Sequence, residues 1–179
     1  TLLELTLVTT KDPDPALVRS WNFVGPGFAF TPPSPSEFVV VVDGRAAPVA
    51  EVGFRRRPIY APARTRDLRI GNSIFLRLET GLAEGQAVSV ENPESSIWTA
   101  GTLQYGAFAD WKRFNPAIHV NQVGYGPAWS KKAMVGYYLG SLGEISVPET
   151  VFHVLDARTR AVQYTGTLTP RRDVGYMYA

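Results

Sequence analysis

The sequence predicts an all-β protein built from two tandem β-sandwich modules, and three observations support this fold class. Short apolar segments that alternate with polar residues recur along the chain, with turn signals at the spacing typical of sandwiches. The chain contains 16 Gly and 14 Pro, which favour many turns and short strands. No long segment has a convincing 3.6-residue period, so we expect no long helix.

The first module is assigned to residues 1–114, and its strands follow from the apolar pattern. Leu3, Leu5 and Leu7 alternate with polar residues, which places one face of the strand on a core and the other in water. The valines within residues 38–42 predict a strand that is buried on both faces. The other expected strands are residues 21–30, with a bend at Gly25-Pro26-Gly27, and residues 46–54, 74–78 and 86–91.

Two further stretches of the first module are interpreted as connections. Residues 55–69 hold six arginines against one acidic residue, with Tyr60 among them. Such a segment could bind an anionic polymer, but arginines of this kind often form interdomain ion pairs, and that interpretation is favoured here. Consecutive arginines on a strand would alternate between its faces, so Arg55 and Arg56 cannot both meet one partner. Residues 99–114 are expected to be an irregular connector.

The second module is assigned to residues 115–179, beginning at the Asn115-Pro116 step. Ile118 and Val120 alternate with His119, which predicts the first strand of this module. Three more strands are expected at residues 132–139, 151–155 and 162–168.

Composition limits the possible partners. The net charge is +2, so no strong field attracts the chain to nucleic acid or to a membrane, and neither is an expected partner. The absence of Cys excludes disulfides and thiolate metal sites. The longest purely aliphatic run, Val39–Val42, is far too short to span a bilayer.

A specific resemblance lies in the last third of the chain. Residues 118–125 read Ile-His-Val-Asn-Gln-Val-Gly-Tyr, and they are followed by Pro127 and by a Lys-Lys-Ala step at residues 131–133. A Val-Gln-Tyr-Thr-Gly strand comes later, at residues 162–166. In this order the elements resemble the N-terminal Ig-like module of family 9 glycoside hydrolases, which are cellulases and related enzymes. Residues 1–100 show no equally specific match.

This resemblance has implications for the fold of the chain, for the domain that follows it and for its cellular location. It implies an Ig-like fold for residues 115–179 and a secreted or periplasmic, bacterial-type protein, in which the module packs against a downstream catalytic barrel. Together with the strand pattern of residues 1–114, this gives two tandem Ig-like β-sandwich modules. Such a module needs roughly 90–100 residues, and residues 115–179 fall short of that number. We therefore expect the second module to be incomplete, with its remaining strands outside this sequence or supplied by a neighbour. The catalytic carboxylates of the family belong to the barrel, so this segment is not expected to be an enzyme by itself.

Candidate contact residues come from two groups. Asn121, Gln122 and Tyr125 lie in the motif, where shaping the module is their first expected role and an interface with the catalytic domain is the hypothesis for function. Aromatic rings that could stack on sugars form the other group, although a core or interdomain position is the alternative for each: Trp98, Tyr105, Trp111 and Trp129.

The sequence contains no residue pattern that predicts a metal or cofactor site. His119 and His153 are far apart in sequence and lack a ligand spacing, so a transition-metal site is not expected. Asp12 and Asp14 could contribute to a Ca²⁺ site, but the prolines around them favour a plain loop. No other cofactor is expected.

The function that follows is a non-catalytic accessory scaffold of a secreted, endo-β-1,4-glucanase-like family 9 glycoside hydrolase, acting in polysaccharide degradation. Its expected partner is the downstream catalytic domain of the same protein. The alternative is a carbohydrate-binding module for β-glucan or cellulose within residues 1–114.

Overall fold

The fold is all-β, as predicted. The computed structural model describes residues 2–10, 21–62, 64 and 68–171, and the helices within this part are three short 3-10 segments. The chain divides into two compact units. The first consists of Thr1–Arg113 together with Tyr137–Ile145, and the second of Phe114–Gly136 together with Ser146–Ala179. The segment Tyr137–Ile145 thus groups with strands that lie far before it in sequence.

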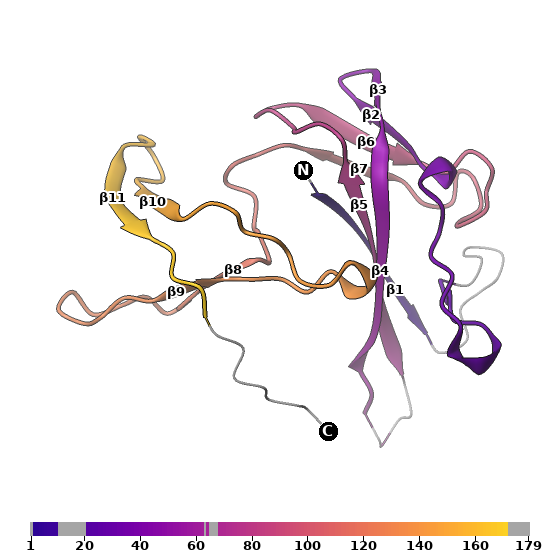
Figure 1. Cartoon of the computed structure of the whole chain (residues 1–179), viewed down its shortest axis with the longest axis horizontal. Coiled ribbons are helices and arrows are strands. Elements are labelled where there is room, and N and C mark those ends of the chain that lie inside the picture. The colour runs from indigo at the N-terminus through magenta and orange to yellow at the C-terminus, as the bar shows by residue number, and fades with distance from the viewer. Residues whose placement is uncertain (1, 11–20, 63, 65–67, 172–179) are drawn as a thin grey trace. The chain divides into compact units, whose positions relative to one another are not determined.

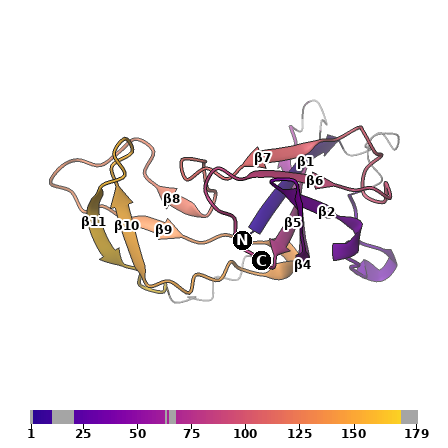
Figure 2. The ribbon, with the colours of Figure 1, turned by 90° about the horizontal axis from the view of Figure 1, so that it is seen from above.

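The first unit contains two antiparallel sheets (Figure 1 and Figure 2). The three-stranded sheet has the order β1-β5-β4, with β1 at Leu2–Thr10, β5 at Arg69–Leu78 and β4 at Val49–Tyr60. The four-stranded sheet has the order β3-β2-β6-β7, with β3 at Arg45–Ala47, β2 at Val39–Val42, β6 at Ala87–Glu91 and β7 at Tyr105–Phe108.

Side chains from both sheets form one hydrophobic core, which makes this unit a β-sandwich. Leu5, Ile74 and Leu76 come from the three-stranded sheet, and Val40 and Val88 come from the four-stranded sheet. Alternation along each strand explains which residues point into the core, since every second residue faces the same side. Burial of these apolar surfaces is the main source of this unit's stability.

Two predicted strands of this unit differ from the observed ones. Val39 is 37% exposed, whereas Val40 is 1% exposed, so β2 is buried on one face and the prediction of burial on both faces is wrong. Residues 46–54 do not form one strand. The chain leaves the four-stranded sheet after β3 and joins the three-stranded sheet at β4, with Pro48 between them. Proline lacks an N–H group and interrupts a ladder of hydrogen bonds, which accounts for the break.

Two strands also lie in stretches that were interpreted as connections, residues 55–69 and 99–114. β4 continues through Tyr60 into the arginine-rich segment, and β7 lies inside the expected connector and pairs with β6. Residues 21–30, which were predicted to be a strand, instead hold an isolated bridge between Val24 and Phe30 around the 3-10 segment η1 (Pro26–Phe28). A second 3-10 segment, η2, spans Pro35–Glu37 and is capped by Ser34.

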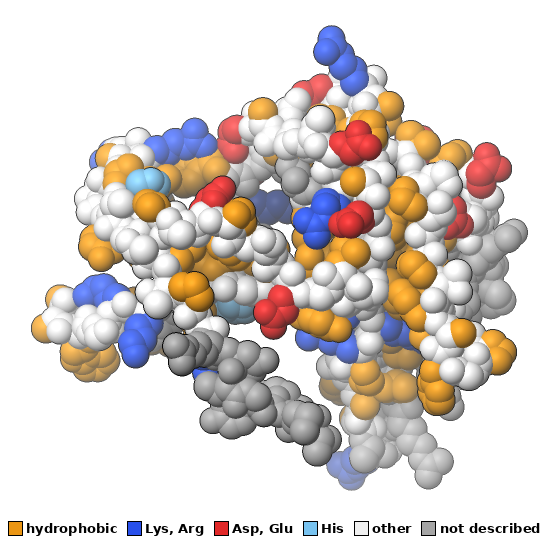
Figure 3. Space-filling view, in the orientation of Figure 1, with side chains coloured by type: hydrophobic (Ala, Val, Ile, Leu, Met, Phe, Trp, Pro, Cys, Tyr) orange, Lys and Arg blue, Asp and Glu red, His pale blue; other side chains and the backbone are white. Residues whose placement is uncertain are grey.

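The second unit has two two-stranded antiparallel sheets. One pairs β8 (Ile118–Val120) with β9 (Ala133–Val135), and the other pairs β10 (Val151–Leu155) with β11 (Val162–Thr167). Among the described residues of this unit, Ala117 alone is buried, and Val151 and Tyr164 are 51% and 59% exposed. Apolar side chains of β10 and β11 therefore lie at the surface (Figure 3).

The expected strand at residues 132–139 is shorter in the structure. β9 ends at Val135, and the chain then forms the 3-10 segment η3 (Gly140–Leu142), which packs beside β4 in the first unit (Figure 1). None of the described residues belongs to a helix with the length and hydropathy needed to cross a bilayer.

Candidate functional surfaces

Two of the four candidate sugar-contacting aromatics lie in the core of the first unit. Trp98 is 2% exposed and meets the Tyr105 ring at a centroid distance of 5.3 Å in an edge-on arrangement. It also lies 6.4 Å from Trp21, a second buried ring. Trp98 is therefore a core residue, and its ring offers no face to a sugar. Tyr105 is partly buried against the same cluster, and its hydroxyl donates to the Thr6 carbonyl at 3.4 Å.

The other two candidate aromatics are more exposed but belong to different units. Trp111 is 38% exposed, in the first unit, and the Lys112 ammonium lies 5.2 Å from its ring centroid. Trp129 is 74% exposed, in the loop between β8 and β9 of the second unit. Within either unit, the structure assembles no platform from the predicted set.

The predicted interface residues Asn121 and Tyr125 bond within their own turn. The Asn121 amide donates to the Gly124 carbonyl at 2.8 Å, and the Asn121 side-chain oxygen accepts from the Val123 N–H at 3.1 Å. The Tyr125 hydroxyl accepts from the Asn121 backbone N–H at 3.1 Å and donates to the Lys132 carbonyl. These bonds satisfy backbone groups that would otherwise face water, so both residues shape the turn, as their first expected role requires.

Other residues of the same loop face outward. Gln122 is exposed, and no hydrogen bond joins its side chain to another described residue. Val123 is 97% exposed. The Lys131 ammonium donates to the carbonyls of Pro127 and Trp129, at 2.9 and 3.1 Å, which ties down the loop beneath the Trp129 ring.

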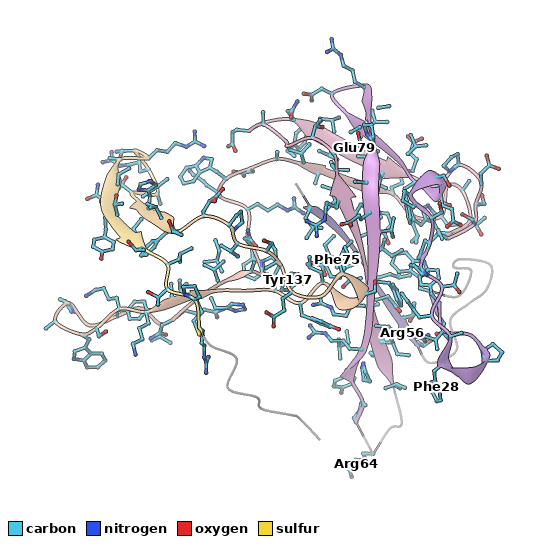
Figure 4. The ribbon with its side chains drawn as sticks, viewed as in Figure 1. Phe28, Arg56, Arg64, Phe75, Glu79 and Tyr137 are labelled. Atoms are coloured by element: carbon cyan, nitrogen blue, oxygen red, sulfur yellow. The ribbon has the colours of Figure 1, made fainter. Side chains whose placement is uncertain are left out.

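A polar cluster joined by several hydrogen bonds lies on the outer face of the three-stranded sheet, which is the face opposite the core. Glu4 on β1 and Gly53 on β4 both pair with Phe75 on β5, so these three residues form one row across the sheet. Phe75 is fully buried even though it points away from the core formed by its neighbours. Its cover comes from Tyr137, whose ring meets it edge-on at 6.1 Å (Figure 4).

Arg55 is the centre of this cluster. Its guanidinium donates to Glu4 at 3.1 Å, to the Tyr137 hydroxyl at 2.8 Å and to the Tyr138 carbonyl at 2.7 Å. It also lies over the rings of Phe75 and Tyr137, with centroid distances of 5.2 and 4.8 Å. The side chains of Arg55 and Glu4 are 13% and 19% exposed, so this ion pair is shielded from most solvent screening.

Tyr137 completes the cluster. Its hydroxyl accepts from Arg55 and donates to Glu4 at 2.8 Å, so one group links the two charges. Burial, above all, raises the pKa of Tyr137, and the nearby Glu4 carboxylate acts in the same direction while Arg55 opposes it. The hydroxyl is therefore neutral when it bridges the ion pair. Burial likewise raises the pKa of Tyr105 to about 12.

The segment Tyr137–Ile145 fits the outer face of this sheet closely. Leu139 is fully buried, and the Ser141 hydroxyl accepts from the Phe54 backbone N–H at 3.0 Å. Gly140 has φ of +63°, and a Cβ at this position would overlap the Phe54 carbonyl. A Cβ at Gly53 would come within 2.5 Å of the Leu142 side chain. Two glycines, one on each side, thus allow the backbones to approach.

Sequence reasoning missed this surface. The strand at residues 74–78 was expected, but no cover was assigned to its second face. The signal was the uninterrupted run Ile74-Phe75-Leu76, because consecutive apolar residues on a strand require burial on both faces. The arginines of residues 55–69 were expected to form interdomain ion pairs, but the ion pair of Arg55 is with Glu4, within the first unit.

The described residues contain no group of three or more His, Asp or Glu side chains placed to hold a metal ion. His119 bonds to the Gly136 carbonyl at 3.1 Å and His153 to the Thr165 hydroxyl at 2.9 Å, each within its own hairpin. Asp12 and Asp14, the candidate Ca²⁺ ligands, lie outside the described residues.

Comparison with known proteins identifies the C-terminal part of the chain. The paired short strands, β8 with β9 and β10 with β11, are consistent with an Ig-like module. Residues 113–175 match the family described as the cellulase N-terminal Ig-like domain, which confirms the resemblance seen in the sequence. No curated protein and no solved structure matches the chain.

Proposed function

We propose that this chain is a non-catalytic accessory region of a secreted family 9 glycoside hydrolase with endo-β-1,4-glucanase-like activity. In this role it braces the downstream catalytic barrel during polysaccharide degradation. The observation that carries the proposal is the match of residues 113–175 to the cellulase N-terminal Ig-like domain. A domain of this kind lies at the N-terminal side of a cellulase and contributes packing, not catalytic groups.

We further propose that the loop between β8 and β9 forms the contact with the barrel. Hydrogen bonds of Asn121, Tyr125 and Lys131 fix this loop, so ordering it at an interface costs little further entropy. Gln122 and Val123 then face outward, and so does the Trp129 ring. Exposed aromatic and aliphatic side chains on a rigid support are typical anchors of protein interfaces. Asn121 and Tyr125 would support this contact indirectly by holding the loop.

The test compares the full-length protein with a version that lacks residues 1–179. Calorimetry should show a lower melting temperature for the catalytic domain when the chain is removed. The same measurement on Val123→Ser/Trp129→Ser should show a smaller decrease of the same sign, with Trp111→Ser as the matched exposed-tryptophan control. An unchanged melting temperature after complete removal would refute bracing.

Binding of β-glucan or cellulose is the second candidate, and no arrangement of the aromatic residues favours it. Trp98 is buried, and Trp111 is the exposed tryptophan of the first unit. Affinity gels with soluble β-glucan test this candidate directly. Retardation that Trp111→Ala abolishes would support a binding module, and equal migration with and without glucan would count against it.

A further inference from the structure

The outer face of the three-stranded sheet is complementary to one particular segment of the chain. That segment, Tyr137–Ile145, packs with the first unit although β9 and β10 of the second unit precede and follow it. We propose that this sheet face is a receptor for residues 137–145, and that holding this segment is a function of the N-terminal unit. The proposal does not depend on the cellulase assignment.

The first argument is steric. Gly140 takes a conformation that side chains rarely adopt, and its Hα side faces the Phe54 carbonyl without room for a Cβ. On the opposite side, Gly53 leaves the space that the Leu142 side chain occupies. Glycine in the middle of a strand weakens it, so Gly53 is best explained by this close approach.

The second argument is polar complementarity. The segment supplies the Tyr138 carbonyl and the Tyr137 hydroxyl to Arg55, and the Ser141 hydroxyl to the Phe54 N–H. The sheet supplies donors and acceptors at matching positions, at distances of 2.7–3.0 Å. Polar groups buried at a contact lower its stability unless they are paired, and these are paired.

The third argument is internal order. The segment closes on itself, since the Leu139 N–H donates to the Gly143 carbonyl at 2.7 Å and the Ile145 N–H donates to the Tyr137 carbonyl at 2.8 Å. It therefore presents Leu139 and Tyr137 from a turn that has its own hydrogen bonds. Tyr138, between them, is 57% exposed and provides a matched control for substitution within the segment.

The experiment uses the whole chain with Trp129→Phe, so that its remaining tryptophans all lie in the first unit and their fluorescence reports that unit's unfolding. In this background Gly140→Ala should lower the midpoint of the first unit, and Tyr138→Ala should leave it unchanged. A synthetic peptide of residues 137–145, with blocked termini, should then raise the midpoint of the Gly140→Ala chain in a saturable manner. The same peptide with Leu139→Ser should have no effect.

Two results would overturn the proposal. One is equal midpoints for Gly140→Ala and Tyr138→Ala. The other is a lowered midpoint that the peptide does not restore at any concentration, which would make the segment a permanent part of the fold and not a ligand of the sheet.

If the Gly140→Ala chain does not fold, hydrogen exchange on the unaltered chain decides instead. The amide protons of Leu139 and Gly143 should then exchange faster than those of Ile74 and Leu76 in β5, because a held segment can leave the sheet while the sheet stays folded. Exchange at these two positions that is as slow as in β5 would make the segment a permanent part of the fold and overturn the proposal.

Discussion

Arg55 offers the sharpest test of the polar cluster that holds Tyr137. The change Arg55→Met keeps a long apolar side chain but removes the donors to Glu4, Tyr137 and the Tyr138 carbonyl. The Glu4 side chain, which is 19% exposed in the unaltered chain, would keep the Tyr137 hydroxyl as its partner. Removing one member of a buried ion pair costs about 3–5 kcal/mol, because the other charge stays buried.

The partial exposure of both side chains lowers this estimate, since water can still reach them. We expect a loss of about 2–4 kcal/mol in the free energy of unfolding. This corresponds to a decrease on the order of 10 °C in the melting temperature of the unit. Urea denaturation followed by tryptophan fluorescence measures it, and a cycle with Glu4→Gln separates the pair's coupling energy from the other losses.

Arg57→Met is the control. Arg57 lies two residues further along β4, on the same face, and is exposed without an ion pair to any described residue. Its substitution should change stability by no more than ~0.5 kcal/mol. If Arg55→Met cost no more than Arg57→Met, the cluster would be a surface contact without energetic weight and the reasoning would fail.

Four other predictions follow from the structure. Leu139→Ala should destabilise the first unit by about 2–5 kcal/mol through loss of a fully buried side chain, measured by urea denaturation; a loss below that range would mean the segment is loosely held. Trp98→Ala should cost about 3–5 kcal/mol and Trp111→Ala much less, and similar costs would contradict the core assignment of Trp98. The contribution of the two tyrosines to stability should be constant below pH 10 and fall as pH rises from 10 to about 12, because the folded-state pKa of Tyr105 is raised to about 12 and that of Tyr137 is raised as well. The Tyr105 contribution is at most ~2 kcal/mol given its partial exposure, and Tyr105→Phe should flatten the profile of urea midpoints against pH. Phe28→Asn should leave stability unchanged or raise it by up to ~1 kcal/mol, because Phe28 has φ of +62° and is 92% exposed; a clear loss would show that the ring makes a contact important for folding.

The sequence allowed the class of the fold and most strands of the first unit to be predicted, because alternation and turn residues are local signals. Leu3, Leu5 and Leu7 face the core side as expected. The strand change at Pro48 and the short strand β7 were not predicted. Both depend on which sheet a segment pairs with, and single-strand patterning does not carry that information.

The functional surfaces also combine features that local sequence patterns predict with features that depend on packing in three dimensions. The motif at residues 121–125 was recognisable, and its asparagine and tyrosine do shape a turn. The exposure of Val123, by contrast, depends on which other segments pack beside its loop, and no local pattern carries that information. The Arg55 cluster joins residues more than 130 positions apart, Glu4 and Tyr137, so it becomes visible only in three dimensions.

We propose that this chain braces a catalytic domain, and calorimetry of the full-length protein measures that effect. With residues 1–179 removed, the catalytic domain should unfold at a lower temperature. The loss should be reproduced in part by Val123→Ser/Trp129→Ser but not by Trp111→Ser. A catalytic domain that unfolds at the same temperature with and without these residues would show that the chain does not brace it.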